Sequence, residues 1–432
     1  MALLLSLVFS PPSLAQQPRT PAKNQNVTRT RVPNPLQELL DRAEKAIAEE
    51  KFAEAVTALD DFIAQQPGDA FAHFHLGYAY TGLKEWDKAK AAYRRAAELK
   101  PDMAAAHLNL GLILYEHDGP EASVPSLRRA AELLANEARP HFLLGTALER
   151  AGKPAEAISA YRAAAALDPR DADVQLALGR VLLNGGKYAE AEATFRHALT
   201  LDGENSGVRL GLAQSLLAQK KLAAAATELE AYVAANPADP DAWLQLASLR
   251  IETEAYDDAL QAIDRAEAAN CLSSESLRLR ADIYLRQRRI DDAITVIRSL
   301  IEQEPNNAEL HGRLGRLHLE QRDFAAAERE LARSLQLDPE QLDPLRDLIS
   351  VYYLAEHYEA ALRMMDRLAQ RETPSAFSWF IRATCYDKLL RKAEAVAAYE
   401  KFLALDQGQS EKQGIQARAR IRILKRELER KP

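Results

Sequence analysis

The sequence is poor in cysteine and in aromatic residues, which limits the classes of protein it can encode. Two cysteines among 432 residues are too few for a disulfide framework or for a zinc site with four cysteine ligands. Cys271 and Cys385 lie 114 residues apart, so we interpret each as an isolated packing residue. Aromatic residues make up 6% of the chain, and runs of β-branched residues are scarce. Because alanine, leucine, glutamate and arginine dominate instead, we predict helix nearly throughout.

The sequence also lacks the short motifs of common enzyme classes. It contains no G-x-x-x-x-G-K-[ST], no G-x-G-x-x-G, no G-x-S-x-G and no H-E-x-x-H. Glu116, His117 and Asp118 adjoin one another, but they fall in a predicted turn, where consecutive side chains point in different directions. We therefore predict a protein that is not an enzyme, with no catalytic residue, no cofactor and no metal site.

The N-terminal residues differ in composition from the rest of the chain. Residues 1–15 contain a short apolar run, Leu3 to Phe9, followed by Ser13-Leu14-Ala15, which resembles the cleavage site of a secretory signal peptide. No basic residue precedes this run, and it is too short to span a bilayer. We expect an exported protein, periplasmic or extracellular, that begins at Gln16 after cleavage; a cytoplasmic protein is the alternative. Residues 16–35 are rich in proline, asparagine and glutamine and are predicted to form a linker.

Charge is distributed unevenly along the chain. Residues 16–35 carry four basic residues and no acidic one, and residues 410–432 carry eight basic and three acidic residues. Since the net charge of the whole chain is −7, residues 36–409 carry −16. Such an acidic body repels phosphate backbones, so we expect no nucleic-acid partner.

A period of 34 residues organises the chain from Leu36 to Gln409. Leu-Gly or Leu-Ala pairs recur on this period, with leucines at positions 76, 110, 144, 178, 212, 246 and 314. Each unit holds two segments with apolar residues at helical spacing. One unit cannot bury its apolar face alone, so neighbouring units must stack. The sequence therefore predicts an all-α solenoid of about eleven helix-turn-helix repeats.

These units resemble the tetratricopeptide repeat (TPR), whose pattern is W-x₂-L-G-x₂-Y, then A-x₃-F, then P. One unit follows it as His73-x₂-Leu76-Gly77-x₂-Tyr80, Ala89-x₃-Tyr93 and Pro101. Trp243 and Trp379 supply the tryptophan in two other units. The resemblance covers residues 36–409 as eleven repeats and implies a right-handed superhelix. Four histidines occupy the place of the tryptophan, and we interpret them as packing residues: His73, His107, His141 and His311.

Local signals predict how individual helices begin and end. Asp69, Asp171 and Asp239 precede first helices as N-caps, whereas Pro125 lies inside a second helix and should kink or shorten it. Residues 410–432 are predicted to form a basic amphipathic capping helix. Its apolar face contains Ala417, Ile421, Leu424 and Leu428. We expect this helix to cover the end of the solenoid; contact with anionic lipid, at most peripheral, is the alternative.

The TPR resemblance implies a non-catalytic scaffold that binds a peptide or a partner protein in a concave groove formed by first helices. The groove positions of repeats two to four that the resemblance assigns are aromatic or polar: Phe71, Phe74, His75, Tyr78, Asn109, Tyr115, Arg139 and Phe142. Core packing is the alternative role for these residues. A second set of groove positions is basic: Arg278, Arg313, Arg316 and Arg346. Acidic residues at matching places make a ladder of ion pairs the alternative to an anion site there.

Two other functions are compatible with the same sequence. The first is a cytoplasmic, chaperone-like adaptor, which would share the fold but not the export. The second is a non-catalytic subunit of an enzyme complex, such as a glycosyltransferase or a secretion assembly. Only about 20 residues at each end lie outside the repeats, far fewer than a catalytic domain needs, so any activity would come from a separate chain.

Overall fold

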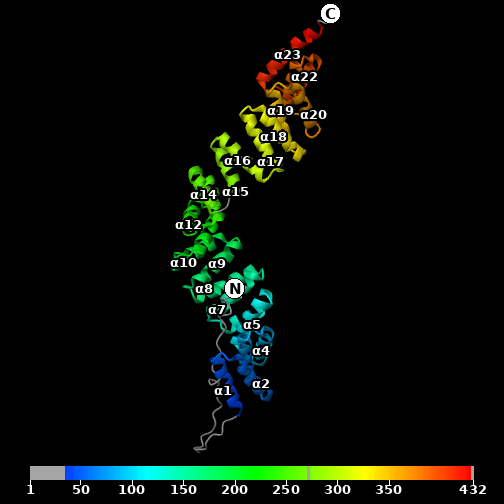
Figure 1. Ribbon diagram of the computed structural model, residues 1–432. Coiled ribbons are helices and arrows are strands. Elements are labelled where there is room, and N and C mark those ends of the chain that lie inside the picture. The colour runs from blue at the N-terminus through cyan, green and yellow to red at the C-terminus, as the bar shows by residue number, and fades with distance from the viewer. Residues whose placement is uncertain (1–34, 270–272, 430–432) are drawn as a thin grey trace, which may run out of the picture. The chain divides into compact units, whose positions relative to one another are not determined.

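The computed structural model describes residues 35–269 and 273–429 (Figure 1). The predicted signal peptide, residues 1–15, and the predicted linker, residues 16–35, lie outside the described residues except for Pro35. The described ranges contain 23 helices and no strand, as the all-α prediction requires. The chain divides into two compact units, Met1–Ala235 and Asn236–Pro432, and each unit is described separately below.

In the first unit, each helix packs against the next one along the chain. The helices of this unit are α1 (Pro35–Ala48), α2 (Phe52–Gln65), α3 (Ala70–Gly82), α4 (Trp86–Leu99), α5 (Ala104–His117), α6 (Pro120–Leu133), α7 (Ala138–Arg150), α8 (Pro154–Leu167), α9 (Ala172–Asn184), α10 (Tyr188–Leu201), α11 (Ser206–Ala218) and α12 (Leu222–Ala235). Odd-numbered helices are the first helices of the repeats and even-numbered helices are the second ones.

The second unit follows the same plan, with one additional helix at its end. The helices of this unit are α13 (Pro240–Glu252), α14 (Tyr256–Ala268), α15 (Ser274–Arg286), α16 (Ile290–Gln303), α17 (Ala308–Glu320), α18 (Phe324–Leu337), α19 (Asp343–Leu354), α20 (Tyr358–Ala369), α21 (Ala376–Lys388), α22 (Lys392–Asp406) and α23 (Glu411–Glu429). Helix α23 is the predicted capping helix, and Ala417 and Leu424 on its apolar face are buried.

Side chains at the N-termini of the first helices satisfy backbone N–H groups that have no partner within the helix. The carboxylate of Asp69 accepts a hydrogen bond from the N–H of Ala72, and Asp171 and Asp239 cap α9 and α13 in the same way. These three caps confirm the sequence prediction. The turn between the two helices of a repeat also follows the period, because a residue with positive φ stands at the same point in every repeat except the third, where Gly119 has this conformation one residue later. Non-glycine residues with this conformation are Glu50, Lys84, Lys220, Glu254, Arg288, Arg322, Glu356 and Leu390.

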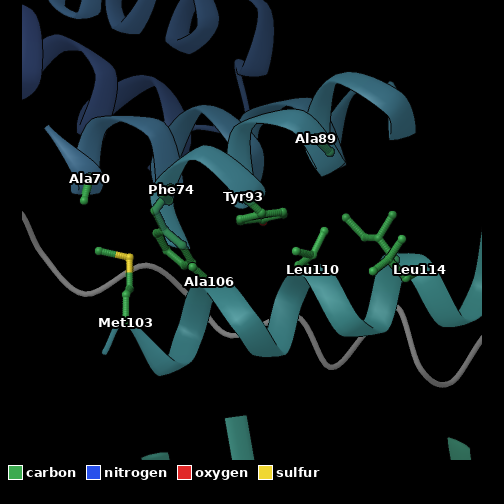
Figure 2. Packing of buried hydrophobic residues seen from close by; sticks show 10 residues of the cluster. Ala70, Phe74, Ala89, Tyr93, Met103, Ala106, Leu110 and Leu114 are labelled. Atoms are coloured by element: carbon green, nitrogen blue, oxygen red, sulfur yellow. The ribbon is translucent and has the colours of Figure 1, made fainter. Parts of the chain in front are cut away.

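Close approach of paired helices depends on the small residue of the Leu-Gly pair. A Cβ atom added to Gly77 in α3 would lie 2.8 Å from Cδ1 of Tyr93 in α4, so the ring packs directly against the glycine backbone. Figure 2 shows Tyr93 and Phe74 between these two helices and Leu110 of α5. Each core cluster therefore joins one repeat to the next, as the stacking argument predicts.

Helix α6 differs from the prediction for Pro125. Both α6 and α4 contain 14 residues, so the proline does not shorten its helix. Pro125 removes only the hydrogen bond to the carbonyl of Glu121, which lies in the exposed first turn of the helix. The prediction of a shortened helix is therefore wrong.

Candidate functional site

The histidines that replace tryptophan make the same hydrogen bond as tryptophan. The indole N–H of Trp243 donates to the carbonyl of Pro237 at 3.1 Å, and Nε2 of His73 lies 3.2 Å from the carbonyl of Pro67. The same contact recurs in three more repeats, between His107 and Pro101, His141 and Ala135, and His311 and Pro305. Because a carbonyl only accepts, Nε2 carries the proton in each case. Within residues 35–269 and 273–429, no three His, Cys, Asp or Glu side chains form a group that could hold a metal ion.

Three of the predicted groove residues lie in the interior of the first unit. Phe74, His75 and Asn109 are each 1% exposed. The ring of Phe74 lies 5.5 Å from that of Tyr93, and the amide of Asn109 donates to the Tyr93 hydroxyl at 3.3 Å. In this structure these three side chains are part of the core, where a ligand in a groove would not touch them.

The other five predicted groove residues of the first unit are half-buried: Phe71, Tyr78, Tyr115, Arg139 and Phe142. Several of them also pack within the chain. The ammonium group of Lys100 lies 4.6 Å from the Phe71 ring centre, and Phe142 packs against Tyr161 at 5.7 Å. Partial burial also raises the pKa of Tyr115. Much of the apolar surface of this patch is thus covered by the chain itself.

Each arginine of the second predicted set has a carboxylate partner. Arg278 is 2.6 Å from Glu304 and Arg313 is 2.7 Å from Glu309. Arg316 is 2.8 Å from Asp347, and Arg346 pairs with Glu372 and, at 3.0 Å, with Asp343. Such pairs neutralise the positive charge locally, so the row of arginines does not present a net positive surface.

An apolar pocket lies between repeats ten and eleven, inside the second unit. Its volume is about 500 Å³, and α19, α20, α21 and the loop between α20 and α21 line it. Met365 and Leu368 of α20 are buried beneath it, 6% and 8% exposed. By contrast, two large apolar side chains of its lining are exposed, Leu354 at 49% and Phe377 at 61%. The pocket thus combines a packed floor with exposed apolar groups.

Helix α20, which lines the pocket, ends earlier than the period predicts. Helix α18 ends at Leu337, whereas α20 ends at Ala369, two residues short of the equivalent position. Arg371 occupies the place of Leu337 in the period, and its guanidinium donates to the carbonyl of Pro339 at 2.7 Å instead of packing inward. The period places the equivalent of Pro339 at position 373, but the proline of this repeat is Pro374, one residue later. Ala369, which lines the pocket, stands where the preceding repeat has the larger and buried Leu335.

Charged groups beside the pocket are paired with one another. Arg346 bonds to Glu372, and both line the pocket. The glutamate hydrogen bond raises the pKa of Arg346. Arg382, also in the lining, pairs with Asp366 of α20. Paired charges leave the apolar lining as the dominant feature of the pocket.

Sequence profiles of one family match most of the chain. Profiles described as tetratricopeptide repeat match residues 40–89, 142–206, 186–243, 216–283, 278–341 and 378–409, and one described as TPR repeat matches 77–118. The chain belongs to the tetratricopeptide repeat family. No curated protein sequence matches it.

Solved TPR structures resemble parts of this TPR chain. PilF of Pseudomonas aeruginosa is 27% identical, with a TM-score of 0.39, and the match covers 47% of this chain and 92% of that one. YrrB, described as a TPR protein with an unusual peptide-binding site, is 20% identical with a TM-score of 0.40, covering 42% and 94%. MamA is 22% identical with a TM-score of 0.37, covering 40% and 94%.

The pocket occupies the same TPR positions as the predicted patch, but in other repeats. Phe377 follows Phe71 by nine periods, so both stand at the same point of a first helix. Of the residues predicted as groove candidates, only Arg346 lines this pocket. Two signals in the sequence fall within its lining: Pro374, which is out of register, and an aromatic residue at position 377.

Proposed function

We propose that this TPR protein binds a segment of a partner protein in the pocket between repeats ten and eleven. Membership of the TPR family makes the chain a protein–protein interaction scaffold. The observation that carries the proposal is the pair of exposed apolar side chains, Leu354 and Phe377, in the lining of a preformed apolar pocket. Exposed apolar groups of this size next to a cavity are typical of recognition surfaces.

The lining defines the chemistry of the partner segment. An apolar side chain, aliphatic or aromatic, would fill the space above Met365 and Leu368 and cover Phe377. Since Arg346 is already paired with Glu372, a strongly charged segment gains little there. Three helices hold the lining in place, so little conformational entropy is lost on binding.

A charge placed at the pocket tests the proposal. Phe377→Glu should weaken binding by roughly 30-fold or more, because a buried aromatic anchor in an interface contributes about 2 kcal/mol or more. Leu390→Glu is the matched control, because Leu390 is 77% exposed and does not line the pocket. Glutamate already occupies the equivalent turn position at Glu254 and Glu356, so the control fits its backbone.

The measurement is quantitative co-purification of tagged wild-type and variant proteins from the native cells. Partners that remain with Leu390→Glu and are lost with Phe377→Glu support the proposal. Partners retained by Phe377→Glu, at unchanged helicity and melting temperature, would exclude the pocket as their binding site. A co-purified transferase or secretion component would identify the complex that the scaffold serves.

We also propose that the protein is exported and that its mature form begins at Gln16. The apolar run before Ser13-Leu14-Ala15 supports this proposal. N-terminal sequencing of the protein from fractionated cells tests it. A protein that begins at Gln16 outside the cytoplasm is the expected result, and an intact N-terminus in the cytoplasm would favour the adaptor alternative.

A further inference from the structure

The last helix, α23, has a second surface that the solenoid does not use. Its inner face packs against α22, and Ala417 and Leu424 are 0% and 2% exposed there (Figure 1). Three ion pairs hold it further: Arg420 with Asp387 in α21, at 2.6 Å, Lys425 with Glu400 in α22, at 2.8 Å, and Glu427 with Lys392 in α22, at 2.9 Å. The opposite face of α23 is exposed along its length.

Positive charge is concentrated on this outer face. Residues 412–426 include six basic residues and no acidic one; Arg420 and Lys425 among them form the ion pairs described above, and Glu411 and Glu429 stand at the two ends of the helix. Arg418, Arg422 and Arg426 are exposed and follow one another at intervals of four residues, so they form a row along one side. Among the residues that the structure describes, no carboxylate forms an ion pair with Arg422 or Arg426. This row therefore differs from the paired arginines of repeats eight to ten.

Large apolar side chains share the outer face with the arginines. Ile415 is 57% exposed and Ile423 is 43% exposed, two turns further along the helix. At 100° per residue, Ile415, Ile423, Arg422 and Arg426 fall within an arc of about 100°. Leu405, at the end of α22, is also 50% exposed.

We propose that the outer face of α23 binds an anionic lipid surface. Guanidinium groups form bidentate hydrogen bonds with phosphate, and isoleucines between them can enter the boundary between headgroups and acyl chains. A convex face of one helix fits a flat surface, whereas an acidic peptide would be held better by a cleft. The net charge of −16 on residues 36–409 repels the same surface, which confines the contact to α23. Among the residues that the structure describes, no helix combines the length and the apolar composition that spanning a bilayer requires.

Flotation of the purified full-length protein with lipid vesicles tests this proposal independently of the pocket. Wild-type protein should float with vesicles of phosphatidylcholine and phosphatidylglycerol, not with phosphatidylcholine alone, and added salt should release it. Each arginine at an anionic surface contributes about a fivefold gain in partitioning. The triple variant Arg418→Gln, Arg422→Gln and Arg426→Gln should therefore bind on the order of a hundredfold more weakly.

Two further variants separate this effect from a general loss of charge. Three exposed arginines outside α23 provide the control: Arg94→Gln, Arg322→Gln and Arg363→Gln together should float like wild-type. The pair Ile415→Ser and Ile423→Ser should reduce flotation without changing its salt dependence. Equal flotation of the α23 and control variants, or flotation with neutral vesicles, would overturn the proposal. A different result would be that wild-type protein does not float with anionic vesicles but binds soluble polyglutamate, and that the triple arginine variant does not bind it. That result would show that the outer face of α23 binds an acidic protein and not a lipid surface.

Discussion

The contact between Gly179 in α9 and Phe195 in α10 gives a quantitative test of how the repeats pack. A Cβ atom on Gly179 would lie 2.6 Å from Cε1 of Phe195, about 1 Å inside the usual contact distance. The ring cannot move away, because it is 1% exposed and lies equally close to Gly211 of the next repeat. Gly179→Ala should therefore overpack the core of the first unit.

The expected magnitude is a difference between two effects. Overpacking costs roughly 1–3 kcal/mol, while replacing glycine by alanine inside a helix stabilises by about 1 kcal/mol. Gly179→Ala should thus lower the free energy of unfolding by about 0–2 kcal/mol. At a helical glycine with free space around it, the same substitution would raise this free energy. Phe195→Leu alone should cost on the order of 1–2 kcal/mol, because it leaves space beside the glycine.

The double variant should recover much of this loss. Two other repeats already contain this combination. Ala213 and Ala247 occupy the position of Gly179, and the aliphatic residues Leu229 and Ile263 occupy the position of Phe195. Gly179→Ala with Phe195→Leu should be more stable than the sum of the single changes by about 1–2 kcal/mol. Hydrogen exchange in urea, read from peptides of the first unit, measures the four free energies, since the two units need not unfold together. Additivity within about 0.5 kcal/mol, or stabilisation by Gly179→Ala alone, would refute this packing argument.

Two further predictions concern titrating groups of the second unit. Burial by itself raises the pKa of Glu330, but hydrogen bonds with His311 and Arg329 outweigh burial and hold this pKa below its usual value of 4.5. The ionised Glu330 therefore stabilises the fold above pH 4.5, and this stabilisation is lost as the pH falls through the lower pKa of the folded protein. The urea midpoints of wild-type and Glu330→Gln should differ at neutral pH and converge in acid. A difference that does not change with pH would contradict the lowered pKa of Glu330. Burial also raises the pKa of the Cys385 thiol to about 11. Iodoacetamide should therefore label Cys385 in urea and leave it unlabelled in the native protein at neutral pH. Equal labelling in both states would contradict its burial.

The sequence was sufficient to predict the features that depend on local geometry. Asp69, Asp171 and Asp239 cap helices because a cap needs only a carboxylate two or three residues before a free N–H. His73 takes the place of a tryptophan because its partner, the carbonyl of Pro67, is six residues away. Such short-range contacts repeat with the period and can be read from it.

Features that depend on differences between neighbouring repeats could not be decided from the sequence, which left both a groove role and core packing open for Phe74. Phe74 stands at a groove position of the TPR pattern. A first helix, however, also has one face against its own second helix and another against the adjacent repeats. The spacing of apolar residues does not show which of these faces a given side chain occupies. The pocket lies where α20 ends early and where Ala369 stands in the place of Leu335. Both are irregularities relative to the period, and their spatial consequence requires the packed helices.

A site-specific photo-cross-linker tests the proposed function most directly. Benzoylphenylalanine would replace Phe377 in one protein and Leu390 in another, and irradiation of living cells would capture whatever lies against each exposed position. A partner bound in the pocket should form an adduct from position 377, with its cross-linked residue in an apolar segment, and no adduct from position 390. Adducts to that partner from position 390 and none from position 377 would contradict the pocket as the binding site.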